Sequence, residues 1–425
     1  MYRFLRILLI AVFPLALYAQ NSPDGMMTIG QVTREAVDKN LGLMAERYNL
    51  SIADARRVTA RLRPNPVFSA GADYQDILGS GFASTPGSSA GPPEVNFRVD
   101  FLLETGGKRH RRMELADDAK AVAEFQLLDA TRLLILEVQN GVTELLLTKA
   151  NLALAEENLK AFNEIVAINS AKVKAGELAE VELVRSKLAA LQFQNAVRQQ
   201  EANLRTARNR LQALMGRAVP QPSFDIAGDF RRDDLPLNKD TVQQQALQQR
   251  PDLQALARDE ARAAADIKLQ VAQGKVDYTV GTEYHHQYAN VDPSANAMGF
   301  FVSVPLPIFN RNQGEIERAR QEEHQIATRS QALKLTIQTE VDNAYVRFET
   351  ARDMLKGIET NMLQQAREVR QTMEYSYRRG EASLVEFLDA QRAFNDTMQS
   401  YNEARAEFAR SLYLTDSITG KVLNP

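Results

Sequence analysis

Four segments of the chain alternate apolar and polar residues, which is the pattern of half-exposed β-strands. In the second segment, Val95, Phe97 and Val99 alternate with polar residues. Each segment is about ten residues long, the length of a tilted membrane strand. A soluble four-stranded sheet with one hydrated face would show the same alternation, so both interpretations stay open. The expected strands lie at about 66–77, 95–104, 276–287 and 298–306.

Two hairpins are expected from these four strands. Residues 79–93, which are rich in Gly, Ser and Pro, join the first two segments, and residues 289–297 join the last two. Such residues favour turns and loops between strands.

The rest of the chain shows the residue spacing of long coiled-coil helices. Apolar residues recur at intervals of three, four and seven, as at Val138 and Val142. Proline, the strongest breaker of helix interiors, is absent between Pro93 and Pro220. We therefore expect residues 108–175 to form one helix of roughly 100 Å, at about 1.5 Å per residue. The second half of the chain repeats this spacing of apolar residues.

Residues 173–184 and 377–388 repeat one sequence element. An offset of 204 (380 − 176) aligns Gly176 with Gly380, and the same offset aligns the neighbouring glutamates. Each glycine interrupts a helical pattern that then resumes. Glycine suits a helix C-terminus because it adopts positive φ without a Cβ penalty. The sequence therefore predicts two long antiparallel helical hairpins with matching tips.

The chain consequently divides into two repeats of similar content, each with a helix, two strands and a hairpin. Glycine and proline residues mark a linker between the repeats, and Arg250-Pro251-Asp252 places a proline at a favourable first-turn position of a helix. The expected divisions are a signal segment at 1–19, a first repeat at 20–215 with its tip at 176, a linker at 216–240, a second repeat at 241–414 with its tip at 380, and a C-terminal tail at 415–425.

The N-terminus has the features of a secretory signal. Arg3 and Arg6 precede an apolar stretch, residues 7–18, that is too short to span a bilayer as a helix. An N-terminal membrane anchor is the alternative. Without residues 1–19 the formal charge is 49 − 54 = −5, which is not typical of a nucleic-acid-binding protein. The chain has no cysteine, which excludes disulfide bonds and thiolate metal sites.

Any membrane insertion must involve the strands. Beyond residue 19 no apolar run reaches 18 residues, so the sequence predicts no transmembrane helix. Inside lipid only a closed barrel pairs every backbone group of a sheet. Four strands are too few to close a barrel, since the smallest have about eight, so several chains would have to share one.

Candidate chemistry is sparse. No HExxH, P-loop or GxGxxG spacing is present, and we expect no enzymatic activity, no cofactor and no dedicated metal site. His285 and His286 are adjacent on a strand and point to opposite faces, so they cannot bind one ion together. Glu283 and His285 share a face and offer a weak cation site. A solvated histidine is the simpler interpretation.

Taken together, three motifs resemble the TolC-type outer-membrane factors over nearly the whole mature length. They are the duplicated tips, the Arg250-Pro-Asp-Leu253 helix start, and residues 302–311, which run from a strand into a helix. Residues 104–109, Glu-Thr-Gly-Gly-Lys-Arg, look like the branch that serves heavy-metal efflux of the cobalt–zinc–cadmium type.

The resemblance implies a fold that is mainly α with β structure. Long antiparallel coiled-coil hairpins would form a periplasmic α-barrel. Four strands from each of three protomers would form a 12-stranded transmembrane β-barrel, so the protein would be a homotrimer embedded in outer-membrane lipid.

The same resemblance implies an outer-membrane channel of a tripartite, RND-type efflux system, extending into the periplasm. The channel would be a passive exit duct for heavy-metal cations. Its partners would be a periplasmic adaptor (membrane fusion protein) and an inner-membrane RND-type pump, with no nucleic acid. A drug-efflux or type I secretion duct is the alternative within this fold. A periplasmic adaptor is a further alternative, but adaptors carry one hairpin in a lipoyl-type β domain, and two hairpins with four strands argue against it.

Five residues form the periplasmic gate that the resemblance implies. The family has acidic residues where this chain has Glu386 and Asp389, which lie three apart and so share a helix face. Tyr377 matches a position that helps to latch the closed entrance. Glu182 is the first-repeat counterpart of Glu386, and Arg185 stands where Asp389 would be, so Arg185 is a candidate partner for Asp389 or Glu386. Solvated helix-surface residues are the simpler interpretation.

The tips themselves are the expected contact with the adaptor, since tips of family members meet the adaptor's helical hairpins. Glycine allows close backbone approach there, and flanking charges fix the register. The expected contact residues are Ala175, Gly176, Glu177, Arg379, Gly380 and Glu381.

Overall fold

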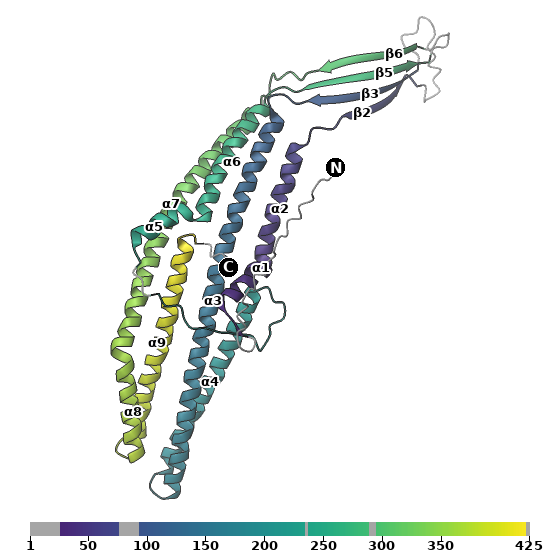
Figure 1. The fold of residues 1–425 in the computed structure, drawn as a ribbon. Coiled ribbons are helices and arrows are strands. Elements are labelled where there is room, and N and C mark those ends of the chain that lie inside the picture. Colours follow the sequence, from purple (N-terminus) through teal and green to yellow (C-terminus); the bar gives the residue numbers. More distant parts are fainter. Residues whose placement is uncertain (1–25, 76–92, 234–236, 289–294, 422–425) are drawn as a thin grey trace, which may run out of the picture.

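The computed structural model describes residues 26–75, 93–233, 237–288 and 295–421. The predicted signal segment at 1–19 lies outside these residues, as do most of the two predicted hairpin loops. The described chain is mainly helical and holds a four-stranded sheet, so the predicted class, mainly α with β structure, is confirmed. Figure 1 shows an elongated molecule, with this sheet at one end and the turns of two helical hairpins at the other.

Both halves of the chain contain the same series of long elements. The first half consists of β1 (Met26–Met27), α1 (Ile29–Lys39), α2 (Leu41–Arg61), β2 (Val67–Asp73), β3 (Glu94–Leu103), α3 (Lys108–Lys174), α4 (Glu180–Leu214) and β4 (Asp225–Ile226). The second half consists of α5 (Lys239–Gln249), α6 (Pro251–Gln273), β5 (Tyr278–Gln287), β6 (Ala295–Ser303), α7 (Gln313–Gly357), the π-helical turn η1 (Ile358–Met362), α8 (Leu363–Arg379) and α9 (Leu384–Ile418).

The four-stranded sheet is antiparallel throughout, in the order β2-β3-β5-β6. Phe97 of β3 stands between Ala70 of β2 and Tyr284 of β5 in the register. Strands β2 and β6 are the two edges, and neither edge has a partner strand among the described residues. Among those same residues, no helix is both long and apolar enough to cross a membrane.

Two strands end earlier than the alternation predicts. Strand β6 stops at Ser303 rather than at 306, because Pro305 has no backbone N–H to donate to a ladder. Strand β2 stops at Asp73 rather than at 77, because Tyr74 has a φ of 56°, which is outside the β region.

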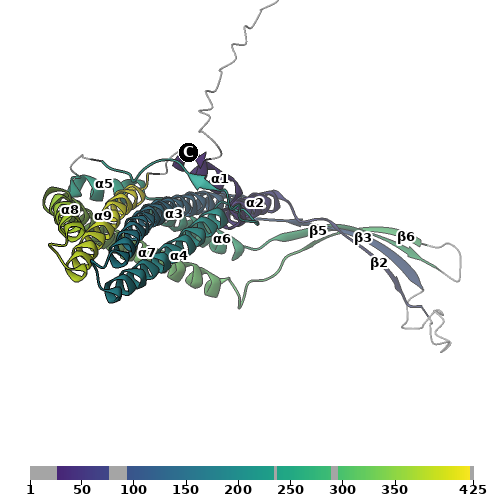
Figure 2. The ribbon, with the colours of Figure 1, turned by 90° about the horizontal axis from the view of Figure 1, so that it is seen from below.

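Helix α3 is the central element of the molecule. Its 67 residues run without interruption from Lys108 to Lys174, as the sequence predicts. It packs against α2 and α6 towards the sheet, and against α4 and α9 towards the tips. Viewed from below in Figure 2, α3 lies between α4 and α9. One helix thus connects the sheet to the tip of the first hairpin.

The corresponding run of the second half is not continuous. Helix α7 gives way at Ile358 to the π-helical turn η1, in which the N–H of Leu363 donates to the carbonyl of Ile358, five residues back. The apolar spacing did not predict this interruption. Helix α9 also extends beyond the expected boundary at 414, because Ile418 is buried against Val242 and Ala246 of α5.

Each half has its own core at mid-height, and one further core near the tips joins the two halves. At mid-height, Val138 and Val142 of α3 pack with Val32 of α1 and Ile226 of the linker strand β4, which pairs in parallel with β1. Near the tips, Phe162 of α3 packs with residues of α8 and α9. Helix α1 and the linker strand β4 therefore pack against the middle of α3.

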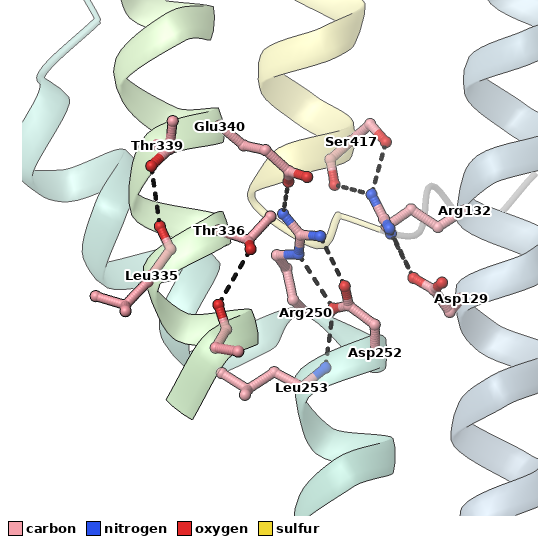
Figure 3. Close-up of polar contacts among 11 residues, drawn as sticks. Asp129, Arg132, Arg250, Asp252, Leu253, Leu335, Thr336, Thr339, Glu340 and Ser417 are labelled. Atoms are coloured by element: carbon pink, nitrogen blue, oxygen red, sulfur yellow. Dashed lines mark hydrogen bonds and ion pairs between the residues drawn. The ribbon is translucent and has the colours of Figure 1, made fainter. Parts of the chain in front are cut away.

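The Arg250-Pro-Asp motif has a structural role (Figure 3). Arg250 lies in the turn between α5 and α6, and its guanidinium donates to the carboxylate of Asp252 at 2.7 and 3.1 Å and pairs with Glu340 of α7. Nearby, Arg132 of α3 donates to the carbonyl of Ser417 in α9 at 3.1 Å. These buried guanidinium groups hold α3, α6, α7 and α9 together at one level.

Candidate functional site

The two hairpin tips have the same backbone geometry. Gly176 has a φ of +78° and Gly380 a φ of +81°, which confirms the predicted positive φ at both positions. At the first tip the N–H of Glu177 donates to the carbonyl of Lys172 at 2.9 Å, and the equivalent bond closes the second tip. A Cβ at either glycine would meet no atom within 4 Å, so the requirement for glycine is one of φ rather than of space.

The residues beside the two glycines differ in charge. Ala175 caps the C-terminus of α3, whereas Arg379 ends α8 and forms an ion pair with Glu381 at 3.2 Å. The hairpins also touch each other here, since the Lys172 ammonium donates to the carbonyl of Arg378 at 2.9 Å. The second tip therefore carries its own ion pair, and the first does not have the matching arginine.

Tyr377 lies buried where the two hairpins meet, with 7% of its surface exposed. Its hydroxyl donates to Oδ1 of Asn169 on α3 at 2.9 Å, and its ring stacks on Phe387 of α9 at 5.5 Å. Burial raises the pKa of this phenol above its ordinary value. Tyr377 thus connects the second hairpin to the first within one protomer.

Arg185 forms a local ion pair on its own helix. Within one protomer its guanidinium donates to Glu182, one helical turn earlier on α4, at 2.9 Å, rather than to Asp389 or Glu386. Asp389 is 3.5 Å from Arg392 on its own helix. Residues three apart on a helix are close neighbours, which explains why these local pairs form.

Glu386 has a structural role that sequence reasoning missed. Its carboxylate accepts from the backbone N–H of Ser383 at 2.8 Å, while the Ser383 hydroxyl accepts from the N–H of Glu386, forming a capping box at the start of α9. These bonds from Ser383 lower the pKa of Glu386. The first repeat has Ala179 in place of the serine, so α4 starts without a side-chain cap.

Buried amide side chains connect the hairpins at further levels. Gln391 of α9 donates to Asn158 of α3 at 2.9 Å, and Asn402 of α9 donates to Asn151 at 3.0 Å. Asn151 and Asn158 lie seven residues apart, so each returns to the same face of α3. That heptad spacing of polar residues within an apolar seam is the signal by which the sequence could have revealed them.

The sheet separates its charges completely. In the register, every Asp, Glu, Lys and Arg of the four described strands lies on one face, and the opposite face carries exposed aromatic residues such as Phe68 and Phe300. The charged residues are Asp73, Glu94, Arg98, Asp100 and Glu283.

His285 lies on this charged face, near two carboxylates. Its ring nitrogens are 3.5 Å from Glu283 and 3.7 Å from Glu94. His286 is on the opposite face, 2.8 Å from Asn296, as the alternation of strand residues requires. Within the described part of the chain, no group of three or more His, Asp or Glu residues is arranged to hold a metal ion.

The Glu-Thr-Gly-Gly-Lys-Arg motif at 104–109 joins two strand–helix junctions. The N–H of Thr105 donates to Asp277 at 2.8 Å, and the Lys108 ammonium donates to Asp277 and to the carbonyl of Lys275, both at 2.7 Å. Gly106, with a φ of +68°, lies so close to Lys275 that a Cβ there would clash with it. The motif therefore connects the β3–α3 junction to the α6–β5 junction.

Most of the chain matches the model of a known protein family. A model of the outer membrane efflux proteins matches residues 32–217 and 242–419. The chain belongs to the outer membrane efflux protein family. It is therefore an outer-membrane efflux channel, and the localisation expected from the sequence is confirmed.

Proteins similar to this efflux channel have names that point to different cargoes. It is 21% identical to the cobalt-zinc-cadmium resistance protein CzcC of Cupriavidus metallidurans, over 93% of this chain and 91% of that protein. It is 26% identical to the pyoverdine export outer membrane protein OpmQ of Pseudomonas putida, over 89% and 84%. The solved outer-membrane channel OprN has the same fold, with a TM-score of 0.76 at 20% identity over 93% of this chain and 91% of that one.

Proposed function

We propose that three copies of this chain close into one passive exit duct of a tripartite efflux system, with heavy-metal cations as cargo. A periplasmic adaptor and an inner-membrane RND-type pump complete the system. The duct itself carries no catalytic step, and the pump supplies the energy.

The observation that carries this proposal is the separation of charge on the sheet. A sheet that closes with copies of itself has one face towards lipid and one towards the lumen, and charged residues on the lipid face are strongly unfavourable. Because the aromatic face has no charge among the described strands, it suits the lipid, and the face with Glu94 and Asp100 lines the lumen.

The edges of the protomer support closure by identical copies. Strands β2 and β6 each have an unpaired edge, and lipid tolerates no open edge. Exposed apolar side chains continue along the helices next to those strands, with Val58 on α2 and Val346 on α7 more than half exposed. Joining β6 and α7 of one copy to β2 and α2 of the next covers both edges and closes a ring.

The charge of the lumen-facing side favours cations. Four carboxylates and one arginine give 1 − 4 = −3 for the described strands of each protomer. Three-fold symmetry arranges these charges as rings, which attract cations and repel anions. The similarity to the metal-resistance protein CzcC agrees with this cargo.

At the other end we propose that the gate is held closed by contacts between the hairpins. Tyr377, bonded to Asn169, is the latch within each protomer. Glu182, Arg185, Glu386 and Asp389 surround the entrance on the same two hairpins, and the local pairs of Arg185 and Asp389 make the entrance less acidic than a ring of free carboxylates.

We further propose that the tips bind the adaptor's helical hairpins. The positive φ of the two tip glycines lets the backbone reverse direction tightly at each tip. The charges of the second tip fix the alignment of the adaptor's helices against it. The contact residues are Ala175, Gly176, Glu177, Arg379, Gly380 and Glu381.

The reversal potential of single channels in a planar bilayer tests the duct and its selectivity. Under a salt gradient the wild type should prefer cations. The triple variant Glu94→Gln, Asp100→Asn, Glu283→Gln should lose most of this preference, because it removes the excess negative charge of the sheet. A variant with unchanged selectivity would show that this face does not line the pore.

A control variant neutralises three exposed helix carboxylates instead, at Glu317, Asp353 and Glu403. It should change the reversal potential less than the strand variant does. Equal changes would mean that diffuse charge, rather than the sheet face, sets the selectivity.

A duct for an organic siderophore is the second candidate, favoured by the similarity to the pyoverdine exporter. Cells that lack this protein should become sensitive to zinc, cobalt or cadmium if the cargo is metal. Normal metal resistance together with lost siderophore secretion would favour the second candidate and leave the duct itself intact.

A further inference from the structure

The charged face of the sheet carries a single Lys or Arg among the described strands, Arg98 of β3. In the register Arg98 stands opposite Glu283 of β5. Opposite charges at directly opposed positions of two strands attract each other. Within the described part of the chain, however, the ion pair that Arg98 forms is with Asp100 and not with Glu283. Other contacts therefore decide where this arginine lies.

Two groups hold the Arg98 side chain. Its Nε donates to both carboxylate oxygens of Asp100, two residues further along the same strand, at 2.9 and 3.1 Å. The guanidinium also lies over the ring of Phe301, 3.5 Å from the ring centroid, which is a cation–π contact. Arg98 is thus both paired and stacked.

The Phe301 ring reaches Arg98 across an intervening strand. Phe301 belongs to β6, and β5 lies between β6 and β3 (Figure 1). The residue opposite Phe301 on β5 is Gly281, and a Cβ there would clash with the Phe301 ring and with the Asp100 carboxylate. Glycine in a strand often marks such a close approach, and an aromatic ring covers the space that it leaves. The contact between Phe301 and Arg98 therefore depends on Gly281.

Phe301 is also the one large residue on the charged face of β6. The other residues of that face are Ala295, Ala297, Gly299 and Ser303. A single ring at the level of the arginine, on a strand face that is otherwise small, indicates that the ring serves the arginine rather than filling the whole face. We call the three residues that hold Arg98, namely Asp100, Phe301 and Gly281, the arginine clamp.

We propose that the arginine clamp determines the charge selectivity of the duct, by keeping Arg98 neutralised against the wall of the lumen. This inference rests on the proposed function, in which the charged face lines the lumen. While Arg98 is clamped, the unpaired carboxylates of the face set the potential that a cargo ion meets. A released arginine, with its long stem, would carry positive charge further from the wall than the short Asp100 carries negative charge. Three copies would place three such charges at one level.

Replacing Gly281 with alanine tests the clamp without changing any formal charge. The added methyl group should displace Phe301 and Asp100 and release Arg98. Under a salt gradient, the reversal potential of single channels should then shift towards that of a non-selective pore. Gly299→Ala is the matched control, because it lies on the same face and its Cβ would meet no atom closer than 4.0 Å. Equal potentials in the wild type and both variants would overturn the clamp.

A double-mutant cycle shows whether this shift passes through the arginine. Arg98→Gln removes the positive charge and should shift the reversal potential the other way, towards a stronger preference for cations. In the Arg98→Gln background, Gly281→Ala should add little further shift, because no arginine remains to be released. Equal shifts by Gly281→Ala in both backgrounds would mean that it acts through the shape of the pore, which would contradict the proposal.

Phe301→Leu carries the test if Gly281→Ala does not assemble. It removes the ring without adding a clash, so its channels should shift in the direction predicted for Gly281→Ala, by a smaller amount because Asp100 keeps its bonds to Arg98. A wild-type reversal potential in Phe301→Leu would overturn the clamp.

Failure of the clamp and failure of the duct give different results. If the wild type forms no channel, or if neutralising the strand carboxylates leaves its selectivity unchanged, the proposed function is wrong in placing this face in the lumen. If those experiments give the predicted results but Gly281→Ala behaves as Gly299→Ala does, only the clamp is wrong.

Discussion

The two hairpins began as copies of one element, and the structure shows how they differ. In the first, α3 is unbroken from the sheet to the tip, and Ala179 leaves α4 without a side-chain cap. In the second, the equivalent run is divided by η1, and Ser383 caps α9. The long helix of the first hairpin is thus continuous, whereas that of the second is interrupted by a π-helical turn and its return helix has a side-chain cap.

This difference shows that a shared tip motif does not fix the structure of the helices around it. The same left-handed glycine ends the first helix of each hairpin, whereas the helix before it and the N-cap after it differ between the repeats.

Removing the aromatic contact between the two hairpins should give the largest loss of stability. Phe162 is fully buried against Phe387, and Phe162→Ala should cost about 3–5 kcal/mol in the free energy of local unfolding. The tips should become sensitive to limited proteolysis. Phe348→Ala, the same change above η1, should leave the tips as resistant as in the wild type, and equal tip cleavage in both variants would contradict the division at η1.

The buried amide pair should give an intermediate effect. Gln391→Leu leaves the buried Asn158 amide without its partner across the seam and should destabilise the seam by about 1–3 kcal/mol, whereas after Asn158→Leu the Gln391 amide keeps its bond to Asn395 at 3.1 Å and the loss should be smaller. The double variant should recover most of this loss, and it should open less often because the seam becomes apolar. Additive losses in a double-mutant cycle followed by hydrogen exchange would show that the two side chains are not coupled.

Changing the N-cap residue of α4 or α9 should have a smaller effect on helix stability, with opposite sign in the two repeats. Ser383→Ala should destabilise the first turn of α9 by about 1 kcal/mol. Ala179→Ser should stabilise α4, because Glu182 already occupies the third position of a capping box there. Hydrogen exchange of the two first turns measures both, and a loss of protection in Ala179→Ser would refute the equivalence of the repeats.

Lowering the pH should destabilise the second tip but not the first, and this should be the smallest of the predicted effects. The pKa of Glu386 is lowered from its ordinary value of 4.5, so its contribution to the cap is complete above that value and is lost as the pH falls through the lowered one. Protection of the first turn of α9, corrected for intrinsic exchange, should fall as the pH drops below 4.5 and through the lowered pKa of Glu386. Ser383→Ala should show no such pH dependence.

Much of this fold follows from local pattern. Positive φ at Gly176 and Gly380 was predictable because only glycine adopts it freely at a helix end. The four strands were visible in their alternation, and the end of the fourth was readable in principle from Pro305. Ser383-x-x-Glu386 is also a readable capping box, yet its carboxylate was interpreted only as part of a gate.

Other features depend on residues that are far apart in the chain. Tyr377 and Asn169 are separated by 208 positions, so no local pattern connects them. The π-turn at Ile358–Met362 has no proline or other strong marker, and Gly357 alone does not specify it. Arg185 pairs within one protomer with Glu182, one turn away on its own helix, and its candidate pairing with Asp389 or Glu386 stays a prediction.

The central claim is that identical copies close the sheet into a duct. Light scattering of the purified protein in mild detergent tests this claim most directly. Two unpaired edges per chain predict a stable assembly of three copies, each of at most 47.5 kDa. A stable monomer that retains the sheet would contradict the account, because one chain would then tolerate open edges in an apolar environment.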